Sequence, residues 1–398
     1  MRTVFTGGRV FDGTGAAIAD ADVAIEDGLI AEVGVGLDGD EQVDVSGRTL
    51  LPGLFDTHVH VMFGHLDLCK HLQTPFSYPF YDAIRNLDAT LRVGITTVRD
   101  AGGADLGLKR AVEEGIVRGP RLQISLTMLS QTGGHADGWM QSGAPDPFPV
   151  YPGMPSPIVD GVEEARRKVR ELVRSGADVI KIATSGGVLS PTDSPDTRGF
   201  APDEIEVMVA EATAAGLFVM SHAQAAVGIK NAVRAGVRSI EHGIYLDDEA
   251  LEMMLEHGTY LVPTLVAPLG VIRAQEAGVP IPDAILVKAN DVVDEHRESI
   301  RRAVAAGVTI AMGTDAGVVP HGTNLEELQL MQDVGMSPTE VLVATTKTAA
   351  ELMGLERELG TLEPGKRADL VVVSGDPLDF SDLSSRIERV YKDGQAAF

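Results

Sequence analysis

The sequence predicts an α/β protein: a (β/α)8 TIM barrel with a small discontinuous β-sandwich domain contributed by both termini. Three observations support this prediction. A strand with two histidines occurs early in the chain, strand and helix patterns alternate after it, and further strand patterns stand at both ends. We expect residues 1–50 and 356–398 to form the sandwich, and residues 51–355 to form the barrel that binds metal and carries the activity.

The composition is that of a folded protein with a large core, because 44% of its 398 residues are apolar. Its one cysteine, Cys69, cannot form an internal disulfide, and no signal peptide is recognisable, so we expect a cytoplasmic protein. No apolar run approaches the ~20 residues that a membrane span needs, so we expect no membrane partner. A net charge of -25 without a basic patch also excludes nucleic acid as an expected partner.

The earliest barrel strand is predicted over residues 54–60, which read Leu-Phe-Asp-Thr-His-Val-His. Side chains alternate sides along a strand, so His58 and His60 project from the same face while Val59 points away. Two neighbouring imidazoles on one strand make half of a metal site.

After this strand the patterns of strand and helix alternate along the chain. Several predicted helices are followed by a glycine that is placed as a C-terminal cap: Gly176, Gly216, Gly236, Gly258 and Gly307. With the opening strand, eight strands are predicted, over residues 54–60, 96–100, 121–126, 179–182, 217–222, 239–242, 260–264 and 309–315. This rhythm is typical of a parallel barrel, and the count of eight favours it over a doubly wound open sheet.

The two ends read differently, as short strands joined by turns. Asp27-Gly28 between alternating apolar runs predicts a hairpin. Residues 368–373 and 387–392 also read as strands, and a strand-rich segment this short cannot bury both faces alone. We therefore expect the two ends to pack together.

Polar side chains at the C-terminal ends of barrel strands converge on one face. The metal-capable ones are His58, His60, Lys181, His222, His242 and Asp315. Imidazole and carboxylate groups suit zinc and related divalent ions. Two long insertions, residues 132–158 and 184–201, follow strands on the same face and are expected to form substrate loops.

The motifs at these positions resemble those of the amidohydrolase superfamily: Pro52-Gly53-Leu54 before His-Val-His, Val179-Ile180-Lys181-Ile182, Ser221-His222-Ala223, Ile240-Glu241-His242-Gly243, Gly313-Thr314-Asp315-Ala316 and the closing run from Gly360 to Leu370. The resemblance implies a binuclear centre of two Zn²⁺ ions per subunit, with Mn²⁺ or Fe²⁺ as alternatives. It implies that His58, His60 and Asp315 hold one ion and His222 and His242 the other. A carbamylated Lys181 would bridge the two, and Asp315 would carry a proton from the attacking water to the leaving group.

Within the superfamily the chain most resembles the branch of Xaa-Pro dipeptidases, ochratoxin-type amidases and imidazolonepropionase-related proteins. The features are residues 182–187 after the lysine, Gly133-Gly134-His135, and residues 241–247. By this resemblance His135 is a further residue of the reaction site that holds or polarises the substrate carbonyl or carboxylate. Gln224 departs from the pattern, because several dipeptidase relatives carry a tyrosine there, and this weakens the expectation of proline specificity.

Further substrate contacts are expected from polar residues near the predicted loops: Gln224, Tyr245, Arg198, His321 and Asn324. Trp139, Phe148 and Tyr151 are candidates for the wall of an apolar pocket.

The leading hypothesis is a metal-dependent hydrolase of amide or peptide bonds in a dipeptide or an N-acyl amino acid. One alternative keeps the metal site but hydrolyses a cyclic amide, urea or carbamate. A second alternative is a non-catalytic metal-binding scaffold, which the presence of Asp315 disfavours. A sugar-phosphate enzyme is weaker still, because no phosphate-binding pattern follows the last strands. We expect a homo-oligomer, as is common among related enzymes.

Overall fold

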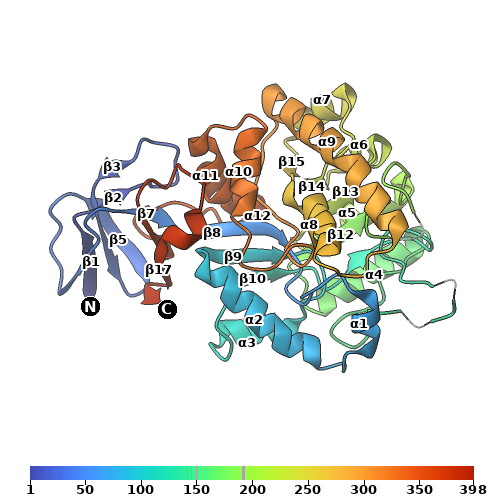
Figure 1. Ribbon diagram of the computed structural model, residues 1–398, viewed down its shortest axis with the longest axis horizontal. Helices are drawn as coiled ribbons and strands as arrows, with labels where there is room; N and C mark the ends of the chain where they lie inside the picture. The colour runs from blue at the N-terminus through green and yellow to red at the C-terminus, as the bar shows by residue number, and fades with distance from the viewer. Residues whose placement is uncertain (141, 145, 149, 191–192) are drawn as a thin grey trace.

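The computed structural model describes residues 1–140, 142–144, 146–148, 150–190 and 193–398. The central part of the chain is a ring of parallel strands surrounded by helices, and the two ends lie together on one side of it (Figure 1).

The barrel strands form two parallel sheets, with the strand orders β10-β9-β8 and β11-β12-β13-β14-β15. Their bounds are β8 (Leu54–Val59), β9 (Ile95–Asp100), β10 (Arg121–Ile124), β11 (Met128–Leu129), β12 (Val179–Ala183), β13 (Phe218–Ala223), β14 (Ser239–His242) and β15 (Tyr260–Val262).

Two irregular stretches close these sheets into one ring. Leu126, with a φ of 67°, breaks the third strand into β10 and β11. The predicted strand over 309–315 is not regular, but its backbone bonds to both neighbours: Leu261 N donates to Thr309 O at 2.9 Å, and Thr57 N donates to Met312 O at 3.0 Å. The eight predicted segments therefore occupy eight positions around a barrel, although the last one is an extended segment and not a β-strand.

The helices cover the outside of the ring and its rim. They are α1 (Leu68–Gln73), α2 (Tyr78–Arg92), α3 (Leu106–Glu113), α4 (Val162–Arg174), α5 (Pro202–Ala214), α6 (Ala226–Ala235), α7 (Asp248–His257), α8 (Val266–Glu276), α9 (Asp283–Ala306), α10 (Glu326–Asp333), α11 (Pro338–Thr345) and α12 (Lys347–Met353), with the short 3-10 helix η1 (Leu383–Arg386) near the C-terminus. Gly236, Gly258 and Gly307 cap α6, α7 and α9 in the left-handed conformation, as the sequence predicted. No helix among the described residues is long and apolar enough to cross a bilayer.

The ends of the chain form two further sheets, visible as the blue and red elements at one side of Figure 1. The first has the order β5-β4-β1-β6, with β1 (Arg2–Thr6), β4 (Asp22–Glu26), β5 (Leu29–Gly34) and β6 (Glu41–Asp44). The second has the order β18-β17-β16-β7-β2-β3, with β2 (Arg9–Val10), β3 (Ala19–Asp20), β7 (Arg48–Pro52), β16 (Leu370–Ser374), β17 (Ile387–Lys392) and β18 (Gln395–Ala396). Asp27 and Gly28 join β4 to β5 with φ values of 51° and 78°, as a two-residue hairpin of type I′ requires.

The six-stranded sheet lies between two cores, because its side chains alternate. Leu50, Leu370 and Val372 pack with the four-stranded sheet, in a cluster that includes Phe5 and Ile30. Their neighbours Leu51, Val371 and Val373 belong to the large core of the barrel. Strand β7 runs to Pro52, so this sheet extends two residues past the expected boundary at residue 50. The division of the chain into two domains stays a prediction.

Candidate metal centre

The end of β8 supplies the first two histidines of the site. His58 Nδ1 lies 2.7 Å from Glu241 Oε2, and His60 Nδ1 lies 2.8 Å from the carbonyl oxygen of Gly102. With Nδ1 held by the protein, each ring turns Nε2 toward Asp315 Oδ1, at 3.6 Å for His58 and 3.2 Å for His60. Possible ligand atoms of these three residues all lie within 4.8 Å of one another, which is a distance that one metal ion can span.

Asp315 reaches this position through an unusual backbone. Its φ of 63° is rare for a residue other than glycine, and its N–H donates to the carbonyl oxygen of His58 at 2.7 Å. Gly313, two residues earlier, allows the segment to approach β8, because a Cβ there would lie 3.1 Å from His58 N and 2.5 Å from Val262 Cγ1. The strain at Asp315 is of the kind that surrounding contacts hold in place at functional sites.

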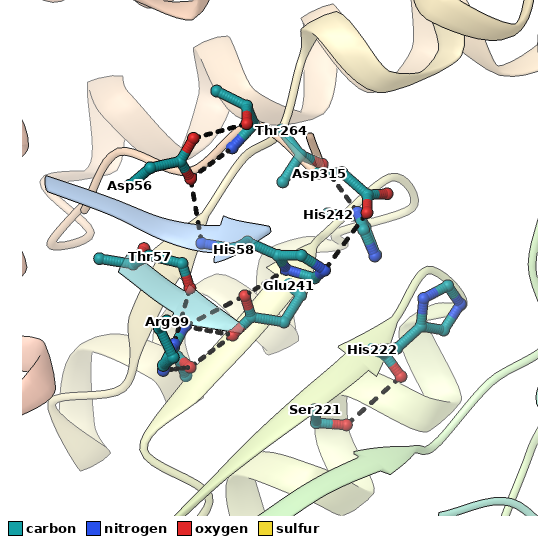
Figure 2. A network of polar contacts seen from close by, with 12 residues as sticks. Asp56, Thr57, His58, Arg99, Ser221, His222, Glu241, His242, Thr264 and Asp315 are labelled. Carbon is teal, nitrogen blue, oxygen red and sulfur yellow. Dashed lines mark hydrogen bonds and ion pairs between the residues drawn. The ribbon is translucent and has the colours of Figure 1, made fainter. Parts of the chain in front are cut away.

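A buried ion pair lies beneath His58 (Figure 2). Arg99 Nη2 lies 3.0 Å from Glu241 Oε1, and Arg99 Nε donates to the carbonyl oxygen of Thr57 at 2.7 Å. Glu241 therefore fixes the orientation of the His58 ring, and Arg99 compensates its charge. The sequence prediction did not assign a role to either residue. An arginine and a glutamate within predicted barrel strands were the available signal.

The remaining predicted ligands come from β12, β13 and β14, which are not neighbours of β8 in the ring. The ring centroid of His242 lies 5.1 Å from that of His58 and 4.6 Å from that of His222. His242 Nδ1 bonds to Thr264 Oγ1 at 2.7 Å, and His222 Nε2 bonds to the carbonyl oxygen of Gly186 at 3.1 Å. Each of these rings thus has one nitrogen held by the protein and the other left for a ligand.

The donor set fits divalent cations. Within the part of the chain that the structure describes, the buried Nζ of Lys181 and the buried Oδ1 of Asp315 have no hydrogen-bond partner, although such atoms are normally satisfied. Burial lowers the pKa of Lys181 to about 8 and the pKa values of His58, His222 and His242 well below their usual value, which favours the neutral imidazole that a metal ligand needs. Burial alone would raise the pKa of Asp315, but the neighbouring His58 and His60 outweigh it and hold that pKa below its usual value.

A cavity of about 420 Å³ opens above this cluster, a volume suited to a small molecule. Its floor contains the six predicted ligands, His58, His60, Lys181, His222, His242 and Asp315. Its walls are rich in aromatic side chains: Phe63, Phe76, Phe80, Trp139, Phe148 and Tyr151. The three aromatic residues that the sequence suggested for a pocket wall thus line the cavity.

The other predicted substrate residues divide into two groups. His135 and Gln224 line the cavity, and the His135 ring stacks on His222 with a centroid distance of 4.1 Å. Tyr245, Arg198 and His321 are not among the described residues that line it.

The residues of the second group and Asn324 have different positions outside the cavity, and Tyr245 packs against the apolar cluster that includes Ile244 and Val271. Arg198 is exposed on the insertion after β12. His321 supports the centre from behind, because its Nε2 lies 3.2 Å from the carbonyl oxygen of His60. Asn324 likewise donates to Asp56 Oδ2 at 2.8 Å. Proximity to a predicted loop in the sequence did not distinguish residues that line the cavity from residues that lie behind its wall.

Comparison with known proteins agrees with this geometry. The profile described as "Amidohydrolase family" matches residues 49–397. The chain belongs to this family. It is 34% identical over 399 residues to the ochratoxinase of Aspergillus niger, which covers 95% of this chain and 82% of the relative.

Solved amidohydrolase structures superimpose over the whole chain. A Xaa-Pro dipeptidase with bound methionine has a TM-score of 0.91 at 33% identity, covering 100% of this chain and 99% of the other. A prolidase in complex with N-methylphosphonate-L-proline has a TM-score of 0.92 at 37% identity, with the same coverage. These findings confirm the family and branch that the motifs indicated, and they confirm the TIM-barrel fold. The chain is therefore a metal-binding hydrolase that acts on carbon–nitrogen bonds.

Proposed function

We propose that this amidohydrolase cleaves the amide bond of a small N-acyl amino acid or dipeptide. The observation that carries the proposal is the meeting of His58, His60 and Asp315 at the floor of an apolar cavity of about 420 Å³. The names of its relatives support the same substrate class, because they include an ochratoxinase, a Xaa-Pro dipeptidase and a prolidase.

The proposed cofactor is a pair of divalent cations, Zn²⁺ in the first instance, with Mn²⁺ or Fe²⁺ as alternatives. His58, His60 and Asp315 would hold one ion, and His222 and His242 the other. A carbamylated Lys181 would bridge them. Its buried amine, which has no partner among the described residues and a pKa of about 8, supports this modification, since the neutral amine is the form that reacts with carbon dioxide. When bound, the ions would lower the pKa of the attacking water and polarise the substrate carbonyl.

The residues of the chain have separate roles in the proposed reaction. Asp315 takes the proton of the attacking water and delivers it to the leaving nitrogen, since its oxygen lies beside both imidazoles of β8. His135 and Gln224 contact the polar groups of the substrate from the cavity wall. The aromatic walls bind its apolar part and exclude water.

Gln224 supports a substrate other than a strict Xaa-Pro dipeptide. Its Oε1 is buried and has no hydrogen-bond partner among the residues that the structure describes, so this amide is available to a substrate group. A tyrosine at this position would place its phenol hydroxyl at a different point in the cavity. We therefore propose a bulky apolar side chain in place of proline, in keeping with the aromatic walls.

Several wider features belong to the same proposal. The enzyme would act on a small-molecule substrate in the cytoplasm, as a homo-oligomer, without nucleic acid or membrane partners. The two terminal sheets would act as a β-sandwich that supports the barrel from one side, since they share the core that includes Phe5 and Leu370.

A substrate panel with protein reconstituted in zinc or manganese tests the proposal. The panel contains dipeptides and N-acyl amino acids, among them N-benzoyl-L-phenylalanine, beside hydantoins, ureas and carbamates. Turnover of the first group is expected. Turnover of the second group alone would replace the proposal by the alternative of a cyclic amide, urea or carbamate hydrolase. If the metal-loaded protein turned over neither group, the alternative of a non-catalytic metal-binding scaffold would gain support.

A further inference from the structure

One lysine of helix α9 forms hydrogen bonds to the loop that follows β12. Lys288 Nζ donates to the carbonyl oxygens of Gly187 at 2.9 Å, Ser190 at 2.5 Å and Asp193 at 3.1 Å. An ammonium group has three N–H donors, so each of them has an acceptor in this loop. The lysine side chain is only 17% exposed, although its partners are about a hundred residues away in the sequence.

The loop held by Lys288 forms the support of two histidines of the site. The carbonyl oxygen of Gly186 bonds to His222 Nε2 at 3.1 Å. Gly187 lies directly against His135, because a Cβ added there would lie 2.2 Å from Cε1 of that ring. A movement of this loop would therefore displace the rings of both His135 and His222.

Asp193 completes the arrangement at the far end of the loop. Its carboxylate is 6% exposed, and Oδ2 lies 3.4 Å from His135 Nδ1. Lys288 Nζ lies 3.9 Å from Oδ1, and neither carboxylate oxygen has a hydrogen-bond partner among the described residues. Since His135 lines the cavity and Asp193 does not, the carboxylate approaches the ring from behind.

We propose that Asp193 is the positioning residue of His135 and that Lys288 holds Asp193 and its loop in place. Stacking on His222, with an interplanar angle of 16°, fixes the plane of the His135 ring but does not decide which edge faces the substrate. A carboxylate beside Nδ1 fixes the rotation of the ring within its plane, so that Nε2 faces the cavity. The inference rests on the proposed function, in which His135 contacts the substrate.

A double-mutant cycle on the metal-loaded enzyme tests the role of Asp193. With N-benzoyl-L-phenylalanine, Asp193→Ala is expected to lower kcat/KM about 10-fold, mainly through KM, and Asp193→Asn is expected to restore part of the loss. In a His135→Asn background, Asp193→Ala should have no further effect, because its action passes through the missing ring. An equal loss in both backgrounds, or no loss in either, would overturn the proposal.

A second measurement does not depend on turnover. Lys288→Met should raise the amide hydrogen exchange of residues 186–190 and of residues 133–138, which surround His135, and Asp193→Ala should raise that of residues 133–138. The matched control is Lys392→Met, which removes a partly buried lysine that bonds to the carbonyl oxygen of Gly119. If the wild type hydrolysed nothing on the panel, the proposed function would fail, while exchange would still decide this inference. Unchanged exchange in both variants would contradict it.

Discussion

At the scale of single residues, the centre depends on one carboxylate. Asp315 Oδ1 lies 3.2 Å from His60 Nε2 and 3.6 Å from His58 Nε2, in a conformation that its own backbone does not favour. In the proposed mechanism this residue combines two roles, because it is a metal ligand and also accepts a proton. An amide in its place could still coordinate weakly through its oxygen, but it could not act as a base.

We therefore expect Asp315→Asn to lower kcat about 10²- to 10⁴-fold, the usual contribution of a positioned acid–base group. Steady-state kinetics with elemental analysis of the same preparation measures this, since a variant that keeps its metal isolates the proton transfer. Asp333→Asn, a change on the surface of α10, serves as the control. An Asp315→Asn enzyme with full turnover would remove the assignment of Asp315 as acid and base.

His296 links pH to stability. It lies on α9 with 1% exposure, its Nε2 bonds to the carbonyl oxygen of His242 at 2.9 Å, and burial lowers its pKa to about 4. The unfolded chain, with a histidine pKa near 6.5, binds a proton that the folded chain does not bind between these values. The stability contribution is therefore present above pH ~6.5 and is lost as the pH falls toward 4, at up to about 1.4 kcal/mol per pH unit.

His296→Gln is expected to reduce this acid sensitivity, because the amide can still donate to His242 but does not titrate. Urea unfolding of metal-free protein at several pH values between 4 and 7 measures the slope. Metal-free protein is used because ligand protonation would otherwise release the ions. If the variant and the wild type showed the same slope, His296 would not be among the groups whose protonation destabilises the fold.

At the scale of elements, the segment from residue 309 to residue 315 shows what the sequence could and could not predict. The position of the segment in the ring followed from its apolar pattern, and the faces of β8 followed from the alternation of side chains. The irregular backbone of the segment could not be predicted from the sequence. The close approach of Gly313 to His58 and the positive φ of Asp315 arise from contacts across the barrel. The roles of Arg99 and Glu241 could not be predicted for the same reason, because their ion pair joins residues of two different strands.

Gly313→Ala tests the close approach of this segment to β8. The added Cβ would meet Val262 Cγ1 at 2.5 Å and His58 Cβ at 3.0 Å, so the segment must move away from β8, which carries His58. We expect a loss of about 1–3 kcal/mol in the free energy of unfolding and a reduced metal content. Denaturant unfolding and elemental analysis check the two effects.

The control for this change is Gly34→Ala. Its Cβ meets nothing closer than the end of the Leu37 side chain at 3.4 Å. If Gly313→Ala were as stable and as rich in metal as Gly34→Ala, the segment would have more freedom than its contacts indicate.

At the scale of the whole molecule, the six-stranded sheet joins the ends of the chain to the barrel. Strand β16 pairs with β7 from Leu370 opposite Pro52 to Ser374 opposite Arg48, so the last part of the chain fixes the strand that leads into β8. One face of this sheet belongs to the barrel core and the other to the terminal core. Since the sheet contributes to both, we expect the two parts to unfold together.

Tyr391→Ala tests this coupling from the side remote from the metal centre. Tyr391 is 7% exposed and meets Phe5 edge to face at a centroid distance of 4.9 Å, so its removal leaves a cavity between the two terminal sheets. A loss of about 3–5 kcal/mol is expected, as for other large aromatic residues. If the molecule is one cooperative unit, hydrogen exchange of the most protected amides should rise equally in β4, beside the cavity, and in β13, within the barrel. Val35→Ala, at a side chain 82% exposed, should change neither. A rise in β4 without one in β13 would mean that the terminal sheets unfold by themselves and that the barrel keeps its structure without them.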